Sequence, residues 1–239
     1  MRGNKNNLKA LLLAAGFGTR LGSLTKIKPK CLMPIKGEPL LGIWIKKLEN
    51  LGCQEIFINT HYLANQVEEY ISSLNSSVKI NISYESKLLG TANTLINHKN
   101  FFKKGDILLI HADNFTKLDF KAFLKDHKKR NRDCLLSMVT FETNYPKSCG
   151  IVSTNKDGIM INFEEKPLNP KSKIANGAIY AFNYKLFKYI EEIKLKNEVN
   201  DFSKDVLPFL KNKVNTFHTK DILIDIGTPT NLKLANEID

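Results

Sequence analysis

Apolar and polar positions in the first half of the chain predict strands that alternate with helices. The unbroken apolar run over 8–14 is typical of a strand buried on both faces, whereas residues 39–50 carry apolar positions at helical spacing. Similar patterns predict strands at 55–60, 79–85, 106–111 and 134–141, and helices at 64–73 and 120–129. Strands separated by helices of about 10–15 residues imply crossover connections and a mostly parallel sheet.

The second half follows a different pattern, with shorter strands and tighter turns. It predicts strands at 150–153, 160–164, 178–183, 214–218 and 222–225, a helix at 202–211, and a last helix that begins at Pro229. These strands indicate a small mixed sheet that extends the first one. Because no linker, repeat or low-complexity segment interrupts the chain, we expect a single domain over residues 1–239.

The composition fits an ordinary soluble globular protein, which we expect in the cytoplasm. The chain has 239 residues, 42% of them hydrophobic, which is enough for a full core. No apolar run approaches the roughly 20 residues of a membrane-spanning helix, so no membrane partner is expected. The four cysteines lack metal-site spacing and are expected to be unpaired thiols in a reducing compartment.

The net charge of +12 comes almost entirely from lysine. Reading of base edges and bidentate gripping of phosphates favour arginine, and the chain has only Arg2, Arg20, Arg130 and Arg132. There is also no aromatic platform for nucleic acid. We therefore expect no nucleic-acid partner, and the most informative cation is Arg20, since it lies in a glycine-rich loop.

This loop follows the first predicted strand and so leaves the sheet at the carboxyl edge, where ligands of α/β proteins bind. Small residues let backbone N–H groups approach phosphate oxygens closely. The loop lacks the third glycine of the dinucleotide fingerprint and the glycine-lysine pair of the P-loop, so a plain tight turn stays an alternative. Its candidate phosphate-binding residues are Ala14, Ala15, Gly16, Gly18, Thr19 and Arg20.

Ten residues after Arg20, the chain has a lysine next to a proline, Pro29-Lys30. Pro29 fixes the backbone beside Lys30 and can hold its ammonium group in place, which makes Lys30 a candidate for binding the reacting phosphates.

With this segment the sequence resembles the sugar-phosphate nucleotidyltransferase family. The stretches that carry the resemblance are Gly16-Phe17-Gly18-Thr19-Arg20-Leu21, Pro29-Lys30, residues 34–40 and Gly227-Thr228-Pro229.

The resemblance implies a Rossmann-like α/β/α sandwich, the nucleotide-diphospho-sugar transferase fold, which agrees with the predicted order of elements. It also implies an enzyme that joins a nucleoside triphosphate to a sugar 1-phosphate and releases pyrophosphate with the help of Mg²⁺. Two departures stand out. Gly22-Ser23 replaces the Arg-Pro of many relatives, and His111-Ala112 precedes Asp113 where many have glycine.

By the same resemblance, Asp113 and Asp225 are the two metal ligands, and they act with Arg20 and Lys30 in catalysis. Each aspartate also ends a predicted strand, and a helix cap or turn residue is the alternative for both. The sugar phosphate is expected to bind at a second set of residues that match the family's sugar pocket. They are Gly150, Glu165, Lys166 and Asn176.

Base selection is expected at Glu85, with Gly90 and Thr91 in a loop that resembles the family's base-binding segment. A carboxylate can accept hydrogen bonds from guanine N1–H and N2–H₂, which favours GTP and a mannose-1-phosphate guanylyltransferase-like enzyme. The carboxylate could instead cap the helix that follows. UTP or CTP, a manno-heptose 1-phosphate, or another phosphorylated acceptor stay open.

A non-catalytic, nucleotide-sensing subunit is the alternative from another functional class. Retention of the whole set of predicted catalytic residues argues against it. The sequence has no hexapeptide repeats of the kind that form an acyltransferase domain, so an enzyme with both nucleotidyltransferase and acyltransferase activity is not expected. A homodimer is a candidate for the assembly of the protein.

Overall fold

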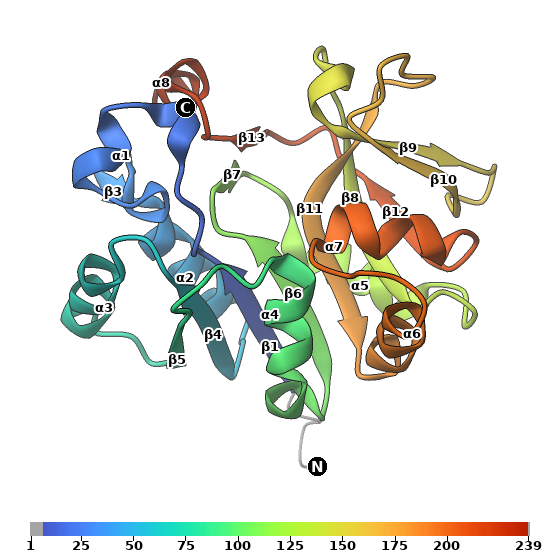
Figure 1. Cartoon of the computed structure of the whole chain (residues 1–239), viewed down its shortest axis with the longest axis horizontal. Coiled ribbons are helices and arrows are strands. Elements are labelled where there is room, and N and C mark those ends of the chain that lie inside the picture. Colours follow the sequence, from blue (N-terminus) through green and yellow to red (C-terminus); the bar gives the residue numbers. More distant parts are fainter. Residues whose placement is uncertain (1–6, 239) are drawn as a thin grey trace. The chain divides into compact units, whose positions relative to one another are not determined.

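The computed structural model describes residues 7–238, which form two compact units (Figure 1). Unit 1 comprises residues 7–88, 110–117 and 222–238, and unit 2 comprises residues 89–109 and 118–221. The chain thus crosses from one unit to the other several times. The expected single domain over 1–239 stays a prediction.

Unit 1 is built on parallel strands. β1 (Leu8–Leu13) pairs with β4 (Glu55–Thr60), and β4 pairs with β5 (Lys79–Tyr84), both in parallel (Figure 1). The end of β6 (Asp106–His111) lies on the other side of β1. Two helices predicted from the sequence, α2 (Leu40–Asn50) and α3 (Ala64–Ser73), provide the crossovers.

Burial explains why these segments form a sheet. Leu11 and Leu12 in β1 and Ile56 and Ile58 in β4 are all 0% exposed, as a strand covered on both faces requires. β5 has only intermediate and exposed residues and forms the edge of the sheet. The strands predicted at 8–14, 55–60 and 79–85 are confirmed to within one residue at their ends.

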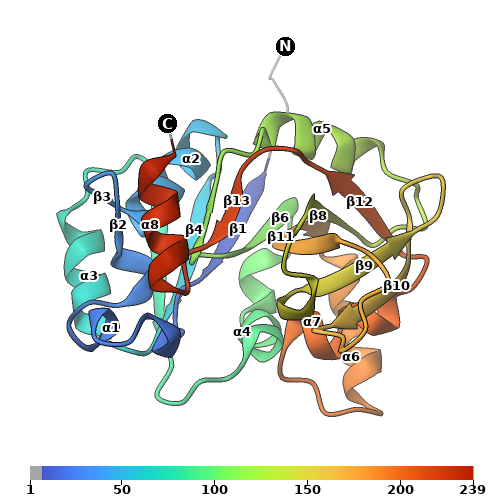
Figure 2. The same ribbon diagram turned by 90° about the horizontal axis from the view of Figure 1, so that it is seen from above.

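Short elements complete unit 1. β7 (Asn114–Thr116) pairs antiparallel with β13 (Leu223–Asp225), and β2 (Pro34–Ile35) forms a hairpin with β3 (Glu38–Pro39). α1 (Leu24–Ile27) follows the glycine-rich loop, and α8 (Pro229–Glu237) begins at the predicted proline. Figure 2 shows α8 directly after β13, so the chain turns sharply just beyond Asp225. β7 was not predicted.

Unit 2 contains the mixed sheet that the sequence predicts. β11 (Ile174–Asn183) pairs antiparallel with both β8 (Leu136–Glu142) and β9 (Gly150–Thr154). β10 (Met160–Glu165) pairs antiparallel with β9, and β12 (Val214–His218) pairs in parallel with β8. Two of its helices, α5 (Phe120–Lys129) and α6 (Lys185–Lys194), lie on opposite faces of these strands (Figure 2).

The helix predicted over 202–211 is wrong. The structure has α7 (Phe202–Asp205) and a separate 3₁₀ turn, η5 (Leu207–Leu210), which contains Pro208. Proline has no N–H to donate to the preceding turn, and its ring collides with the carbonyl four residues earlier. α4 (Thr91–Asn97) and α6 were not predicted, and β11 begins four residues before the predicted 178.

Candidate active site

The glycine-rich loop after β1 is held by a contact with α1. Gly18 has φ 67°, and a Cβ atom there would lie 2.8 Å from Cγ2 of Thr25 and 3.1 Å from Cβ of Lys30. The Thr25 hydroxyl lies 3.2 Å from the carbonyl oxygens of both Gly18 and Gly22. Thr25 therefore fixes the turn, and the sequence did not single it out.

Backbone donors are available in this loop. Within the described part of the chain, no group accepts a hydrogen bond from the N–H groups of residues 16–19. The N–H of Ala14 differs, since it donates to Oδ1 of Asn59 at 2.9 Å. Successive N–H groups in a turn with a left-handed residue, as Gly18 is here, are a typical binding site for an anion.

The predicted catalytic residues meet in one charged cluster of unit 1. Lys30 Nζ donates to Oδ2 of Asp113 at 2.6 Å and to Oδ1 of Asp225 at 2.7 Å. The two carboxylate oxygens can therefore be no farther apart than these two distances together. Arg20 Nη2 lies 2.9 Å from the other oxygen of Asp225. The structure thus brings together four side chains from three segments that are far apart in the sequence.

The two aspartates are placed by the small β7–β13 ladder. In this ladder Asn114 lies opposite Asp225, and the N–H of Ile226 donates to the carbonyl of Asp113 at 3.0 Å. Trp44, which is 1% exposed in α2, donates its indole N–H to the carbonyl of Asn114 at 2.8 Å. The core of unit 1 therefore anchors the backbone that carries both carboxylates.

Gly227 is in close contact with this cluster. A Cβ atom there would lie 2.7 Å from Arg20 Nη2 and 2.8 Å from both Lys30 Nζ and Asp225 Oδ1. Its own N–H donates to Asp225 Oδ1 at 2.8 Å. A side chain at this position would displace the charged groups. The Gly-Thr-Pro stretch was the sequence signal, but it gave no reason why glycine is needed.

Electrostatics keep Asp225 ionised. Burial raises the pKa of its carboxyl group, but the positive charges of Lys30 and Arg20 outweigh burial, so the pKa lies below its usual value. With two cations and two carboxylates the cluster is close to neutral. Lys30 is nearly buried, with 8% of its side chain exposed, whereas Asp113 and Asp225 are 33% and 41% exposed. Their oxygens therefore remain open to a further cation.

The two aspartates fit a magnesium ion that also binds substrate oxygens. Their oxygens already converge on one positive charge, the ammonium of Lys30. Among the described residues, no group of three or more His, Cys, Asp or Glu side chains could hold a metal. Mg²⁺ is usually held by one or two carboxylates together with water and phosphate oxygens, so a pair is sufficient.

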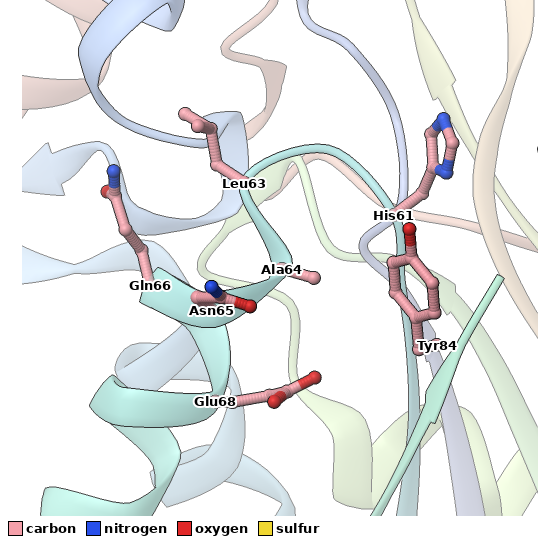
Figure 3. Close-up of a pocket in the computed structure, with 7 residues that line it drawn as sticks. All are labelled: His61, Leu63, Ala64, Asn65, Gln66, Glu68 and Tyr84. Atoms are coloured by element: carbon pink, nitrogen blue, oxygen red, sulfur yellow. The ribbon is translucent and has the colours of Figure 1, made fainter. Parts of the chain in front are cut away.

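Glu85 directly follows β5 and is only 4% exposed. Its carboxylate accepts a hydrogen bond from Asn59 Nδ2 at 2.9 Å, and its backbone N–H donates to Thr60 at 2.8 Å. Next to it, Tyr84 and His61 line one side of an open pocket of about 630 Å³, with the first turn of α3 on the other side (Figure 3). The role of Glu85 in base selection stays a prediction.

In unit 2 two of the predicted sugar-phosphate residues are in contact. A Cβ atom at Gly150 would lie 2.8 Å from Glu165 Oε2 and 2.5 Å from the ring of Phe163, so glycine makes room for both. Burial raises the pKa of Glu165; Lys166 opposes this shift, and Asp201 adds to it. Lys166 Nζ lies 3.9 Å from Glu165 Oε1 and is 65% exposed.

Asn176, the fourth predicted sugar-phosphate residue, already has internal partners. Its Nδ2 donates to the hydroxyl oxygens of Tyr180 at 2.6 Å and Ser203 at 3.3 Å, and its Oδ1 accepts from the N–H of Ala178 at 2.9 Å. Ala178 has φ 52°, at an irregularity in the β11–β8 register. Asn176 therefore stabilises a bend in β11, and its contact with sugar stays a prediction.

Gly90 and Thr91 pack against the segment that leads into α7. A Cβ atom at Gly90, which has φ 84°, would lie 2.4 Å from the carbonyl oxygen of Asn200. The Thr91 hydroxyl donates to Asp201 Oδ2 at 3.0 Å and accepts from the N–H of Phe202 at 2.7 Å. Both residues thus have structural roles in unit 2, and their role in nucleotide binding stays a prediction.

The chain matches the family model described as nucleotidyl transferase over residues 9–239. It is 30% identical to a glucose-1-phosphate adenylyltransferase of Bacillus cytotoxicus, over 97% of this chain and 68% of that protein. It is 29% identical to the enzyme of the same name from Clostridium perfringens strain 13, over 98% of this chain and 65% of that protein. The chain thus spans about two thirds of the length of these relatives.

Solved structures confirm the fold class. One described as a glucose-1-phosphate thymidylyltransferase of Bacillus anthracis superposes with a TM-score of 0.84 at 24% identity, over 97% of this chain and 96% of that chain. HddC of Yersinia pseudotuberculosis gives 0.79 at 26% identity, over 96% and 98%. The HddC complex with GMP-PN gives 0.77 at 25% identity, over 96% and 98%. No helix in the described residues is long and apolar enough to cross a membrane.

Proposed function

Because the chain belongs to the nucleotidyl transferase family, we propose that it transfers a nucleotidyl group from a nucleoside triphosphate to a sugar 1-phosphate. The observation that carries this proposal is the pair of aspartates that share Lys30, next to a loop with free N–H groups. The names of the curated relatives support a sugar 1-phosphate as acceptor. A cytoplasmic location and a homodimer stay predictions.

In this proposal the N–H groups of residues 16–19 bind triphosphate oxygens, and Arg20 and Lys30 offset their negative charge. An oxygen of the sugar phosphate attacks the α-phosphorus and forms a new P–O bond. The bond from the α-phosphorus to the oxygen bridging to the β-phosphorus breaks, and pyrophosphate leaves with the electron pair. No general base is needed, because a phosphate nucleophile is already ionised. The protein mainly supplies position and charge.

Asp113 and Asp225 would hold the Mg²⁺ ion. When bound, the ion neutralises charge on the triphosphate and makes the phosphorus easier to attack. Lys30 keeps the two carboxylates close together in the present structure, and Gly227 leaves the space in which they converge.

Residues of unit 2 are proposed to bind the sugar phosphate. The exposed ammonium of Lys166 suits the phosphate, and Glu165 suits a sugar hydroxyl because its carboxylate is partly buried beside Gly150. Mannose or a manno-heptose is the sugar proposed from the sequence. The names of the curated relatives make glucose the competing choice.

GTP is the proposed donor. Glu85 has the carboxylate that guanine N1–H and N2–H₂ would pair with, and the structurally similar HddC has been crystallised with GMP-PN. Relatives and neighbours named for adenylyl and thymidylyl transfer make ATP and dTTP the alternatives. Adenine has no ring N–H to donate on its Watson–Crick edge, so a buried carboxylate suits it less well.

A pyrophosphate-release assay tests the reaction and the base together. Five triphosphates, ATP, GTP, UTP, CTP and dTTP, are each paired with mannose, glucose and manno-heptose 1-phosphates in the presence of Mg²⁺. We expect kcat/KM for GTP to exceed that of every other nucleotide by at least about tenfold, the effect of one well-placed polar contact. Glu85→Gln, which keeps the shape of the side chain, is expected to move the preference toward UTP and dTTP.

The outcomes separate the parts of the proposal. Preference for ATP or dTTP by the unaltered protein would reject the assignment of guanine and leave the reaction intact. Nucleotide binding without pyrophosphate release from any of these pairs would instead favour a nucleotide-sensing subunit.

A further inference from the structure

The end of β4 connects the glycine-rich loop with Glu85. Asn59, the next-to-last residue of β4, uses both ends of its amide. Oδ1 accepts the N–H of Ala14 at 2.9 Å, and Nδ2 donates to Glu85 Oε1 at 2.9 Å. Asn59 and Glu85 are each 4% exposed. One buried side chain thus fixes the first residue of the loop and the predicted base-selecting carboxylate at the same time.

His61 makes a second connection of the same kind. Its Nδ1 lies 2.7 Å from the carbonyl oxygen of Glu85, and because a carbonyl can only accept, Nδ1 carries the hydrogen. The imidazole also packs edge-on against Phe17, the central residue of the loop, with ring centroids 5.2 Å apart at 79°. Tyr62 contacts the same Phe17 ring, with centroids 5.6 Å apart.

We propose that Asn59 and His61 are positioning residues, which couple selection of the nucleobase to placement of the triphosphate. This inference rests on the proposed function, in which Glu85 reads the base and the loop binds phosphates. Neither residue needs to touch the nucleotide. Each acts through the loop on one side and through Glu85 on the other, so that base and phosphate sites keep a fixed separation.

The chemistry of Asn59 makes this coupling specific. The Asn59 amide accepts from a backbone N–H with its oxygen and donates to a carboxylate with its nitrogen, so the two bonds use different atoms of one planar group. An aspartate at this position would keep the acceptor for Ala14 but remove the donor to Glu85. It would also place a second negative charge beside a buried carboxylate, which is unfavourable.

The first test is therefore Asn59→Asp, with nucleotide binding as the readout. GTP and UTP are titrated calorimetrically into the protein with Mg²⁺, without a sugar phosphate. Loss of a hydrogen bond to a charged group corresponds to about tenfold to a hundredfold in affinity. We expect GTP affinity to fall by this factor and UTP affinity to change much less, so that selectivity is lost. The KM of the sugar 1-phosphate should stay within about twofold, because Asn59 is none of the residues proposed to bind the sugar phosphate and lies far from them in the sequence.

Asn81→Asp is the matched control. Asn81 in β5 donates to Glu55 in β4 at 3.5 Å, so it joins the same two strands by the same pair of residue types near their opposite ends. It contacts neither the loop nor Glu85. We expect its GTP-to-UTP ratio to equal that of the unaltered protein.

A double variant tests the hydrogen bond itself. In Asn59→Asp with Glu85→Gln, the amide at position 85 can donate to the carboxylate at position 59, so the bond is restored with reversed polarity. We expect nucleotide binding to recover, with the preference moved toward UTP.

The variant His61→Phe keeps a ring beside Phe17 and removes the Nδ1 donor. It should lower the GTP-to-UTP affinity ratio, as Asn59→Asp does, but by a smaller factor. Thermal melting of each variant checks that it is folded.

An Asn59→Asp variant that retains the GTP-to-UTP ratio would overturn the coupling. So would an equal loss of affinity for both nucleotides, or a similar change in the Asn81→Asp control. The proposed function fails in a different way, if the unaltered protein binds neither nucleotide or does not prefer GTP. These results are read on the unaltered protein alone, so the two failures are distinguishable.

Discussion

Asp113→Asn and Asp225→Asn are each expected to lower kcat for pyrophosphate release by a factor of about a hundred to a thousand, as loss of a preorganised charge at a reacting centre does elsewhere. Asparagine keeps the size of the side chain and removes the negative charge. Both carboxylates bind Lys30, and both retain exposed surface that a magnesium ion could reach. The fold should survive, because the β7–β13 ladder depends on backbone groups at these positions.

Asp221→Asn provides the control for these two variants. Asp221 is exposed and lies two residues before β13. It accepts hydrogen bonds from the Thr219 hydroxyl and the Asp119 N–H. We expect its kcat to be unchanged. Steady-state kinetics at saturating triphosphate and sugar phosphate provide the measurement. Near-normal kcat in either Asp113→Asn or Asp225→Asn would remove that residue from the metal site.

Gly227→Ala is expected to abolish most activity at little cost in stability. The added Cβ would come within 2.8 Å of Asp225 Oδ1, Lys30 Nζ and the still closer Arg20 Nη2. These are the far ends of flexible side chains, which can move away cheaply, so the free energy of unfolding should fall by less than about 1.5 kcal/mol. The movement breaks the convergence of the charges, however. We expect kcat/KM to fall by about a hundredfold, since misplacement by about 1 Å can have this effect.

Gly90→Ala is the useful comparison, because its added Cβ would meet backbone rather than flexible side chains. The carbonyl oxygen of Asn200 would lie 2.4 Å away, and φ is 84°. We therefore expect this variant to melt well below the unaltered protein. Chemical denaturation and kinetics of both variants provide the check. A Gly227→Ala variant with normal activity would show that the cluster tolerates displacement.

The regular part of the fold was predictable because burial imposes its pattern on the sequence. The strand at 106–111 has four consecutive buried apolar residues, and the helix at 120–129 begins directly after Asp119, whose side chain caps it. α6 was missed although Leu186, Phe187 and Ile190 are buried at helical spacing. Its N-cap, Tyr184, makes no capping bond, and it follows a long apolar strand almost without a break.

The chemistry of the candidate site was only partly predictable. Motifs identified the loop, Lys30 and the two aspartates, because charged residues and glycines in a recognisable order can be read directly from the sequence. The roles of Asn59 and Gly227 depend on contacts with residues far away in the sequence, such as the bond from Ala14 to Asn59 across 45 positions. Conversely, Asn176 and Thr91 have the polar groups expected of ligand contacts, but these groups bind neighbouring protein atoms.

Anomalous diffraction from crystals grown with Mn²⁺ and a non-hydrolysable GTP analogue would locate the metal directly. Manganese replaces magnesium among oxygen ligands and gives an anomalous signal. We predict one peak coordinated by carboxylate oxygens of both Asp113 and Asp225 and by phosphate oxygens of the nucleotide. A nucleotide-bound metal with neither carboxylate among its ligands would contradict the proposed site.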